Sequence, residues 1–91
     1  MLAQQRTRPR DLPTIAVIDD TIAQRLRRRR RFCGKTQQEL GARVGVRAQQ
    51  IQKYECGANR VSAGKLWLIA QVLGVDIGYF YEGLCDTTNP R

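Results

Sequence analysis

Apolar residues recur three or four positions apart through most of this 91-residue chain, and that spacing is typical of amphipathic helices. No segment alternates polar and apolar residues for long enough to predict a strand. The positions expected to face inward are Ile22 and Leu26; Leu40 and Val44; Ile51 and Tyr54; Leu66, Ile69, Ala70 and Leu73; and Ile77, Phe80, Tyr81 and Leu84. The pattern therefore predicts an all-α fold of five short helices.

Residues that begin or end helices stand between these stretches. Asp19 or Asp20 would cap a first helix that runs to about residue 32, and Gly34 would end it. Thr36 and Glu39 have the spacing of a capping box, so they predict the start of a helix over residues 37–44. The further helices are expected from about residue 47 to 56, between Ser62 and Gly74, and from Asp76 onward.

The second and third predicted helices have the features of a helix-turn-helix, in which two short helices meet across a tight turn. Gly41 provides the small residue that a close crossing needs, and Gly45 tolerates the positive φ of the turn. Val46 would then fill the corner between the helices. Because each role is filled at a compatible spacing between residues 37 and 57, the motif is more specific than any single glycine.

The charge of the chain is strongly positive and unevenly distributed. Sixteen Lys and Arg against eight Asp and Glu give a net charge of +8, with +6 on residues 1–31, +4 on 32–65 and −2 on 66–91. Such a balance favours a polyanionic partner, either nucleic acid or an anionic membrane. The chain contains no His, which removes His-based acid–base chemistry and most zinc sites. We therefore expect neither an enzyme nor a metal or cofactor site.

The two ends differ in composition from the middle of the chain. Residues 1–14 are polar and basic, so we expect a disordered arm there, followed by one helical domain over 15–85 and a short tail over 86–91. The apolar run 15–18 would pack at the edge of the core.

The chain lacks the sequence features of membrane or secreted proteins. No apolar run approaches the ~18 residues that a membrane span needs. The three cysteines, Cys33, Cys56 and Cys85, are too far apart for a zinc knuckle and odd in number for a disulfide framework. These features predict a cytoplasmic protein with free thiols and no membrane contact.

Residues 27–31 are five consecutive arginines on the first predicted helix. Because the run covers more than one full turn, at least one guanidinium must lie against the core. A buried guanidinium needs a carboxylate partner, so we expect an ion pair there.

From Thr36 to Gly57 the sequence resembles the Cro/phage-repressor (XRE) family of helix-turn-helix proteins. The resemblance is carried by Thr36-Gln-Gln-Glu-Leu40, Gly45-Val46 and Ile51-Gln-Lys-Tyr-Glu-Cys-Gly57. The stretches 49–55, 57–62 and 79–84 are similar to a bacterial subgroup of short regulators that are described as similar to the sporulation repressor SinR. The resemblance covers about residues 19–84. It implies a lambda-repressor-like fold and binding to operator DNA as a homodimer.

The resemblance also implies roles for individual residues. Arg30 matches a family arginine that pairs with a glutamate at the end of the third helix, which is Glu55 here. Gln37 matches a glutamine that contacts a DNA phosphate, while Asn59 and Arg60 lie in a loop that touches the DNA backbone in the family. The sequence departs from the family at Ala48, where better-known repressors read a base with glutamine, and at Cys56, where this subgroup usually carries a basic residue.

Helical geometry leads to the same face of the third predicted helix. At 100° per residue, an inward Ile51 places Gln49, Gln52 and Lys53 on the opposite side. Gln can bond adenine and Lys can donate to guanine in the major groove. The base-reading candidates are Ala48, Gln49, Gln52 and Lys53, and the candidates for backbone contact are Gln37, Arg43, Arg47, Asn59 and Arg60, with Arg27–Arg29.

We therefore expect a sequence-specific DNA-binding regulator, a repressor that binds operator DNA as a homodimer in the bacterial cytoplasm, at the nucleoid. Residues 47–56 would enter the major groove, and dimer contacts would involve the fifth helix with Tyr79, Phe80 and Tyr81, together with the run 15–18. Two alternatives stay open: an antitoxin or phage-type autorepressor that also binds a partner protein, and an interaction module that has lost DNA binding.

Overall fold

The computed structural model describes residues 12–84, and the regular elements in this part of the chain are all helices, without strands. The expected all-α class is therefore confirmed. The elements are α2 (Ile15–Phe32), α3 (Gln37–Val44), α4 (Ala48–Glu55), α5 (Ala63–Leu73) and the 3-10 helix η2 (Ile77–Tyr81). The expected arm over 1–14 and tail over 86–91 lie outside the described residues, apart from residues 12–14.

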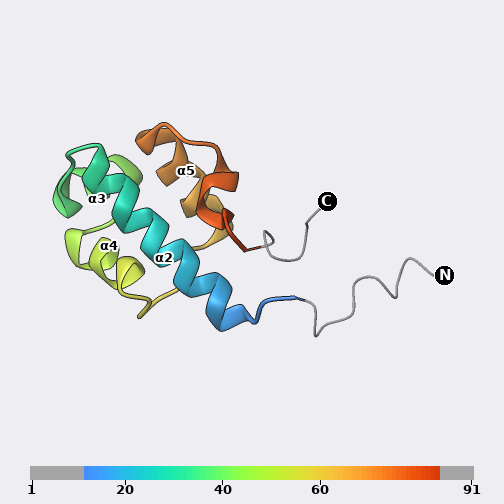
Figure 1. Ribbon diagram of the computed structural model, residues 1–91. Coiled ribbons are helices and arrows are strands. Elements are labelled where there is room, and N and C mark those ends of the chain that lie inside the picture. The colour runs from blue at the N-terminus through green and yellow to red at the C-terminus, as the bar shows by residue number, and fades with distance from the viewer. Residues whose placement is uncertain (1–11, 85–91) are drawn as a thin grey trace.

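Helix α2 begins earlier than the sequence pattern predicts. Thr14 is its N-cap, and the Thr14 hydroxyl accepts a hydrogen bond from the Val17 N–H at 3.2 Å. The expected cap at Asp19 or Asp20 is therefore wrong, because a suitable capping residue precedes them and nothing between the two sites interrupts a helix. The run 15–18 forms the first turn of α2 and extends beyond the other helices, with only Ile18 half-buried (Figure 1).

The fifth expected helix is a single 3-10 segment rather than an α-helix. Gly78 in its centre lowers helix propensity, and Glu82 ends the segment in an extended conformation. Of the residues expected to face inward, Phe80 is fully buried whereas Ile77 and Tyr81 are 40% exposed.

The turn between α3 and α4 has the geometry that the two glycines predict. Gly45 ends α3 in the left-handed region at φ +81°. Gly41 lies under the turn so closely that an added Cβ would be 2.5 Å from the Val46 carbonyl oxygen. A side chain at this position would therefore push the start of α4 away from α3. The capping box of α3 is also present, with Thr36 and Glu39 bonded to each other's backbone N–H.

The core lies where α2 crosses the other helices (Figure 1). In this view α3 and α4 lie beside its C-terminal half, and η2 packs on its opposite side next to α5. The largest fully buried side chains come from every element: Leu26, Leu40, Ile51, Ile69, Leu73 and Phe80. Since α2 contacts both α4 and η2, it fixes the helix-turn-helix against the rest of the domain.

None of the helices between residues 12 and 84 combines the length and the apolar character that crossing a lipid bilayer requires.

Candidate nucleic-acid interface

A buried ion pair joins α2 to the last residue of α4. Arg30 and Glu55 are each only 8% exposed, and two hydrogen bonds connect them: Arg30 Nε to Glu55 Oε2 at 2.5 Å and Nη2 to Oε1 at 3.0 Å. This is the pair that the family resemblance implies, and it identifies the arginine of the run that turns inward. A parallel two-bond contact of this kind fixes orientation as well as distance.

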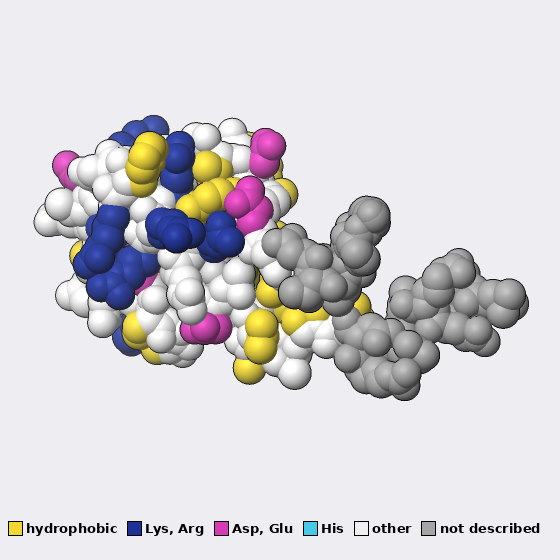
Figure 2. Space-filling model, in the orientation of Figure 1, with side chains coloured by type: hydrophobic (Ala, Val, Ile, Leu, Met, Phe, Trp, Pro, Cys, Tyr) yellow, Lys and Arg dark blue, Asp and Glu magenta, His cyan; other side chains and the backbone are white. Residues whose placement is uncertain are grey.

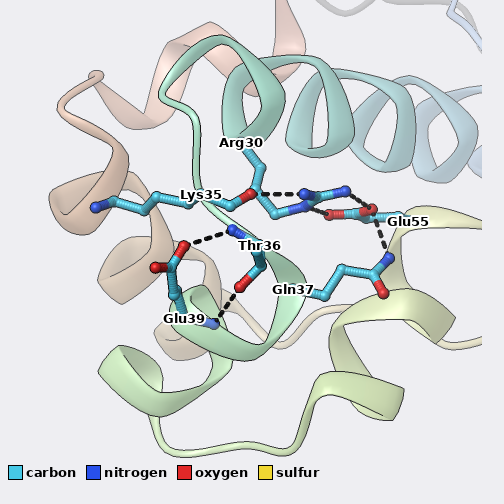
Figure 3. Close-up of polar contacts among 6 residues, drawn as sticks. All are labelled: Arg30, Lys35, Thr36, Gln37, Glu39 and Glu55. Atoms are coloured by element: carbon cyan, nitrogen blue, oxygen red, sulfur yellow. Dashed lines mark hydrogen bonds and ion pairs between the residues drawn. The ribbon is translucent and has the colours of Figure 1, made fainter.

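The same ion pair also positions the start of α3. Arg30 Nη1 donates to the Lys35 carbonyl oxygen at 2.7 Å, and Gln37 Nε2 donates to Glu55 Oε1 at 3.1 Å (Figure 3). Next to it, the Thr36 N–H donates to Glu39 at 2.8 Å, and this hydrogen bond holds the pKa of the Glu39 carboxyl below its usual range. The first turn of α3 is therefore fixed relative to both α2 and α4.

Helix α4 presents the residues that the sequence suggested for base contact. Gln49, Gln52 and Lys53 are exposed and Ala48 is half-buried, while Ile51 is fully buried on the opposite side. Gln49 borders two shallow hollows on this surface, one shared with Lys53 and the other with Ala48. Gln52 lies elsewhere, in a cleft between α4 and α2. Gln49, Gln52 and Lys53 thus share the outward side of α4, with Ala48 at its half-buried edge, but the four candidates do not line a single hollow.

Among the candidates for backbone contact, Arg43 and Arg47 are exposed and make no side-chain hydrogen bond within residues 12–84. Arg47 is also the N-cap residue of α4 and lines both hollows beside Gln49. Gln37 differs from them, because one of its amide N–H groups is already bonded to Glu55.

The two loop candidates are engaged within the protein, which the sequence did not predict. Asn59 Oδ1 accepts a hydrogen bond from Gln50 Nε2 at 3.1 Å. Arg60 Nε donates to Asp19 Oδ2 at 2.8 Å in a largely exposed ion pair. A DNA phosphate that binds Arg60 would have to compete with this carboxylate.

Lys65 is a further residue of this region that sequence reasoning missed. Its ammonium group donates to the Val44 carbonyl oxygen at 2.7 Å, so α5 holds the C-terminal end of α3. A cation in the first turn of its own helix is unfavourable, but at the end of α3 it complements the partial negative charge of the carbonyl groups. The sequence did contain a signal for this contact, because a lysine three residues after the Ser62 cap lies in the first turn of a helix, where a cation is unfavourable without another partner.

Basic side chains gather on this side of the molecule, over α2 and the neighbouring helices (Figure 2). A basic surface of this kind attracts a polyanion.

Comparison with known proteins agrees with this geometry. The sequence profile of a family described as helix-turn-helix matches residues 26–80, which include α3, α4 and α5. A protein of Rhodospirillum rubrum named as a transcriptional regulator in the ATPase CF(0) region is 47% identical over 81 residues, covering 89% of this chain and 74% of that protein. An HTH-type transcriptional regulator of Sinorhizobium fredii is 45% identical, covering 78% of this chain and 50% of its own length. These relatives are named as regulators and not as enzymes.

A solved structure has the same arrangement of helices. The crystal structure of FeII HppE in complex with substrate superposes with a TM-score of 0.63 at 25% identity, covering 68% of this chain but only 36% of that one. The chain therefore spans about half of some relatives and about a third of this structure. The profile match and the relatives show that the chain belongs to the Cro/C1-type (XRE) family of helix-turn-helix transcriptional regulators.

Proposed function

We propose that the protein is a sequence-specific repressor that binds operator DNA as a homodimer, with α4 in the major groove. The observation that carries the proposal is the outward side of α4, where Gln49, Gln52 and Lys53 are exposed while the helix is fixed through Glu55. A helix held in this way can present amide and ammonium groups to base edges without first becoming ordered. As a regulator of transcription it would act at the nucleoid, in the bacterial cytoplasm.

Base reading is tested by selecting bound duplexes from a random pool and then measuring the affinity for the enriched operator and for a scrambled duplex. Gln49→Ala and Lys53→Ala are expected to cost about 1–3 kcal/mol on the operator and much less on the scrambled duplex. Gln71→Ala is the matched control, because Gln71 is an exposed glutamine on α5, outside the helix-turn-helix. Equal losses on both duplexes would contradict base reading by α4.

The dimer would form through exposed apolar side chains of α5 and η2. Phe80 is fully buried and therefore unavailable, but Trp67 is 55% exposed and Leu68, Ile77 and Tyr81 are at least 40% exposed. Two copies would place their α4 helices in half-sites about 34 Å apart. Sedimentation of Trp67→Ala is expected to show weaker association than the parent chain. A parent chain that sediments as a monomer, both free and on the operator, would refute the homodimer.

A further inference from the structure

The five arginines of residues 27–31 have different environments on α2. Arg30 is bonded to Glu55, and Arg29 Nε donates to the Leu73 carbonyl oxygen at 2.9 Å while its guanidinium lies over the Phe32 ring. These two are therefore committed to the protein itself. The other three, Arg27, Arg28 and Arg31, are exposed.

Arg27 and Arg31 lie on the same side of α2, since residues four positions apart are neighbours on a helix surface. Both line a cleft of about 180 Å³ between α2 and α4. Gln52 and Cys56 form the opposite wall of this cleft, on the α4 side. Arg28, which follows Arg27 on the helix, does not line the cleft.

The charge in this cleft favours an anion. The Arg30–Glu55 pair also borders the cleft, but its two charges offset each other at hydrogen-bond distance. Among residues 12–84 neither Arg27 nor Arg31 forms an ion pair, so their guanidinium groups add two positive charges to the cleft, one helical turn apart. Guanidinium groups bind phosphate oxygens with two parallel hydrogen bonds, so a phosphate group fits the chemistry of the cleft.

We propose that Arg27 and Arg31 bind a backbone phosphate of the DNA whose bases α4 reads, so that the DNA contact extends from the helix-turn-helix onto α2. The inference rests on the proposed function, because α4 must enter the groove for the backbone to reach the cleft. Gln52 belongs to both surfaces, as it lies on the outward side of α4 and also lines the cleft. A phosphate between Gln52 and the two arginines would fix how deeply α4 enters the groove. Arg27 and Arg31 would then contribute to affinity for every sequence, and not to the choice among them.

The test compares Arg27→Gln and Arg31→Gln with the parent chain and with Arg28→Gln, which removes the same charge from the same run outside the cleft. The sequence also suggested Arg28 for backbone contact, whereas the present proposal expects Arg28→Gln to keep the slope of the parent chain. Affinity is measured for the selected operator and for a scrambled duplex between 50 and 200 mM salt. Each cleft variant is expected to lose about one unit of slope in a plot of log affinity against log salt, on both duplexes alike. The loss of affinity over this fourfold salt range would thereby become about 3.5-fold smaller. Slopes equal to that of Arg28→Gln would overturn the proposal.

Inorganic phosphate has the same chemistry as a backbone phosphate, and a second measurement distinguishes a free anion in the cleft from DNA. The parent chain is titrated with inorganic phosphate while the Nε–Hε signals of Arg27 and Arg31 are followed by NMR. Shifts in these signals, combined with unchanged DNA slopes in the two variants, would assign the cleft to a free anion and overturn the proposal. Failure of the proposed function is recognised separately, because the parent chain would then bind operator and scrambled duplex equally well. The slopes on the scrambled duplex would still report on the cleft.

Discussion

The buried pair between Arg30 and Glu55 allows a quantitative test of how the fold supports the candidate interface. In Glu55→Ala, Arg30 would lose both of its hydrogen bonds to the carboxylate and keep only the bond to the Lys35 carbonyl oxygen. Gln37 would lose its acceptor as well. The substitution thus leaves a guanidinium that is 8% exposed without a counter-charge.

Removing one partner of a buried ion pair costs about 3–5 kcal/mol, because the remaining charge stays desolvated. Small domains have total stabilities of about 5–15 kcal/mol, so this is a large fraction of the whole. At about 4–8 °C per kcal/mol for a domain of this size, Tm is expected to fall by about 12 °C or more. Removing the charge together with its partner, in Arg30→Met with Glu55→Met, replaces the pair by apolar side chains and should recover part of the loss.

The free energy of unfolding is measured by urea titration followed by circular dichroism, for the parent chain, Glu55→Ala and the double variant. Glu55→Gln is the conservative control, since its amide oxygen can still accept from Arg30 and its loss should be smaller. A cost below about 1 kcal/mol for Glu55→Ala would refute the reasoning. A double variant no more stable than Glu55→Ala would also contradict it, because the unpaired charge would then not be the cause of the loss.

Three further substitutions test other parts of the helix-turn-helix. Gly41→Ala places a methyl group against the Val46 carbonyl oxygen and should destabilise the domain by about 1–3 kcal/mol in a urea titration. Its control, Gly64→Ala on α5, has open space around the new methyl group and should be neutral or stabilising. Lys65→Met removes a charged donor from the Val44 carbonyl oxygen and should cost about 1.5–3 kcal/mol, measured against Lys35→Met. Glu39→Gln tests pH dependence. Since the pKa of Glu39 is lowered from about 4.5 by its bond to Thr36, the parent chain should have the higher Tm above that pH. The difference should disappear as the pH falls through the folded-state pKa, and a difference that persists at low pH would contradict this account.

The features that could be predicted from the sequence have local causes. The capping box of Thr36 and the left-handed Gly45 depend on residues within one helical turn, and the structure contains both. The small residue at Gly41 could also be predicted, since any helix pair that crosses at so short a turn needs one. The outward position of Gln49 follows from the inward position of Ile51 by helical periodicity.

The features that were predicted wrongly are those that the local sequence does not determine. Thr14 and Asp19 are both acceptable N-caps, and the sequence does not rank them. The arginine run is a different case: periodicity requires only that some member turns inward, while the family resemblance named Arg30, and its ion pair with Glu55 is present in the structure. Phe80 is buried rather than available for dimer contact, because η2 packs against α2.

The same distinction separates the two kinds of candidate DNA contact. A base-reading residue on α4 is defined by the direction in which the helix presents it, and this direction can be derived from the sequence. A residue can contact the DNA backbone with a net gain only if its charge has no ion-pair partner within the protein. Whether it has such a partner depends on residues that are distant in the sequence. Arg60 is exposed, yet it is already bonded to Asp19, so binding a phosphate there exchanges one anion for another. Among the residues that the structure describes, Glu55 is the one carboxylate that lines the cleft of Arg27 and Arg31, and Arg30 already occupies it. Net favourable backbone contacts should therefore be stronger on α2 than in the loop after α4, although the family resemblance assigns such contacts to Gln37 and to that loop and not to Arg27 or Arg31.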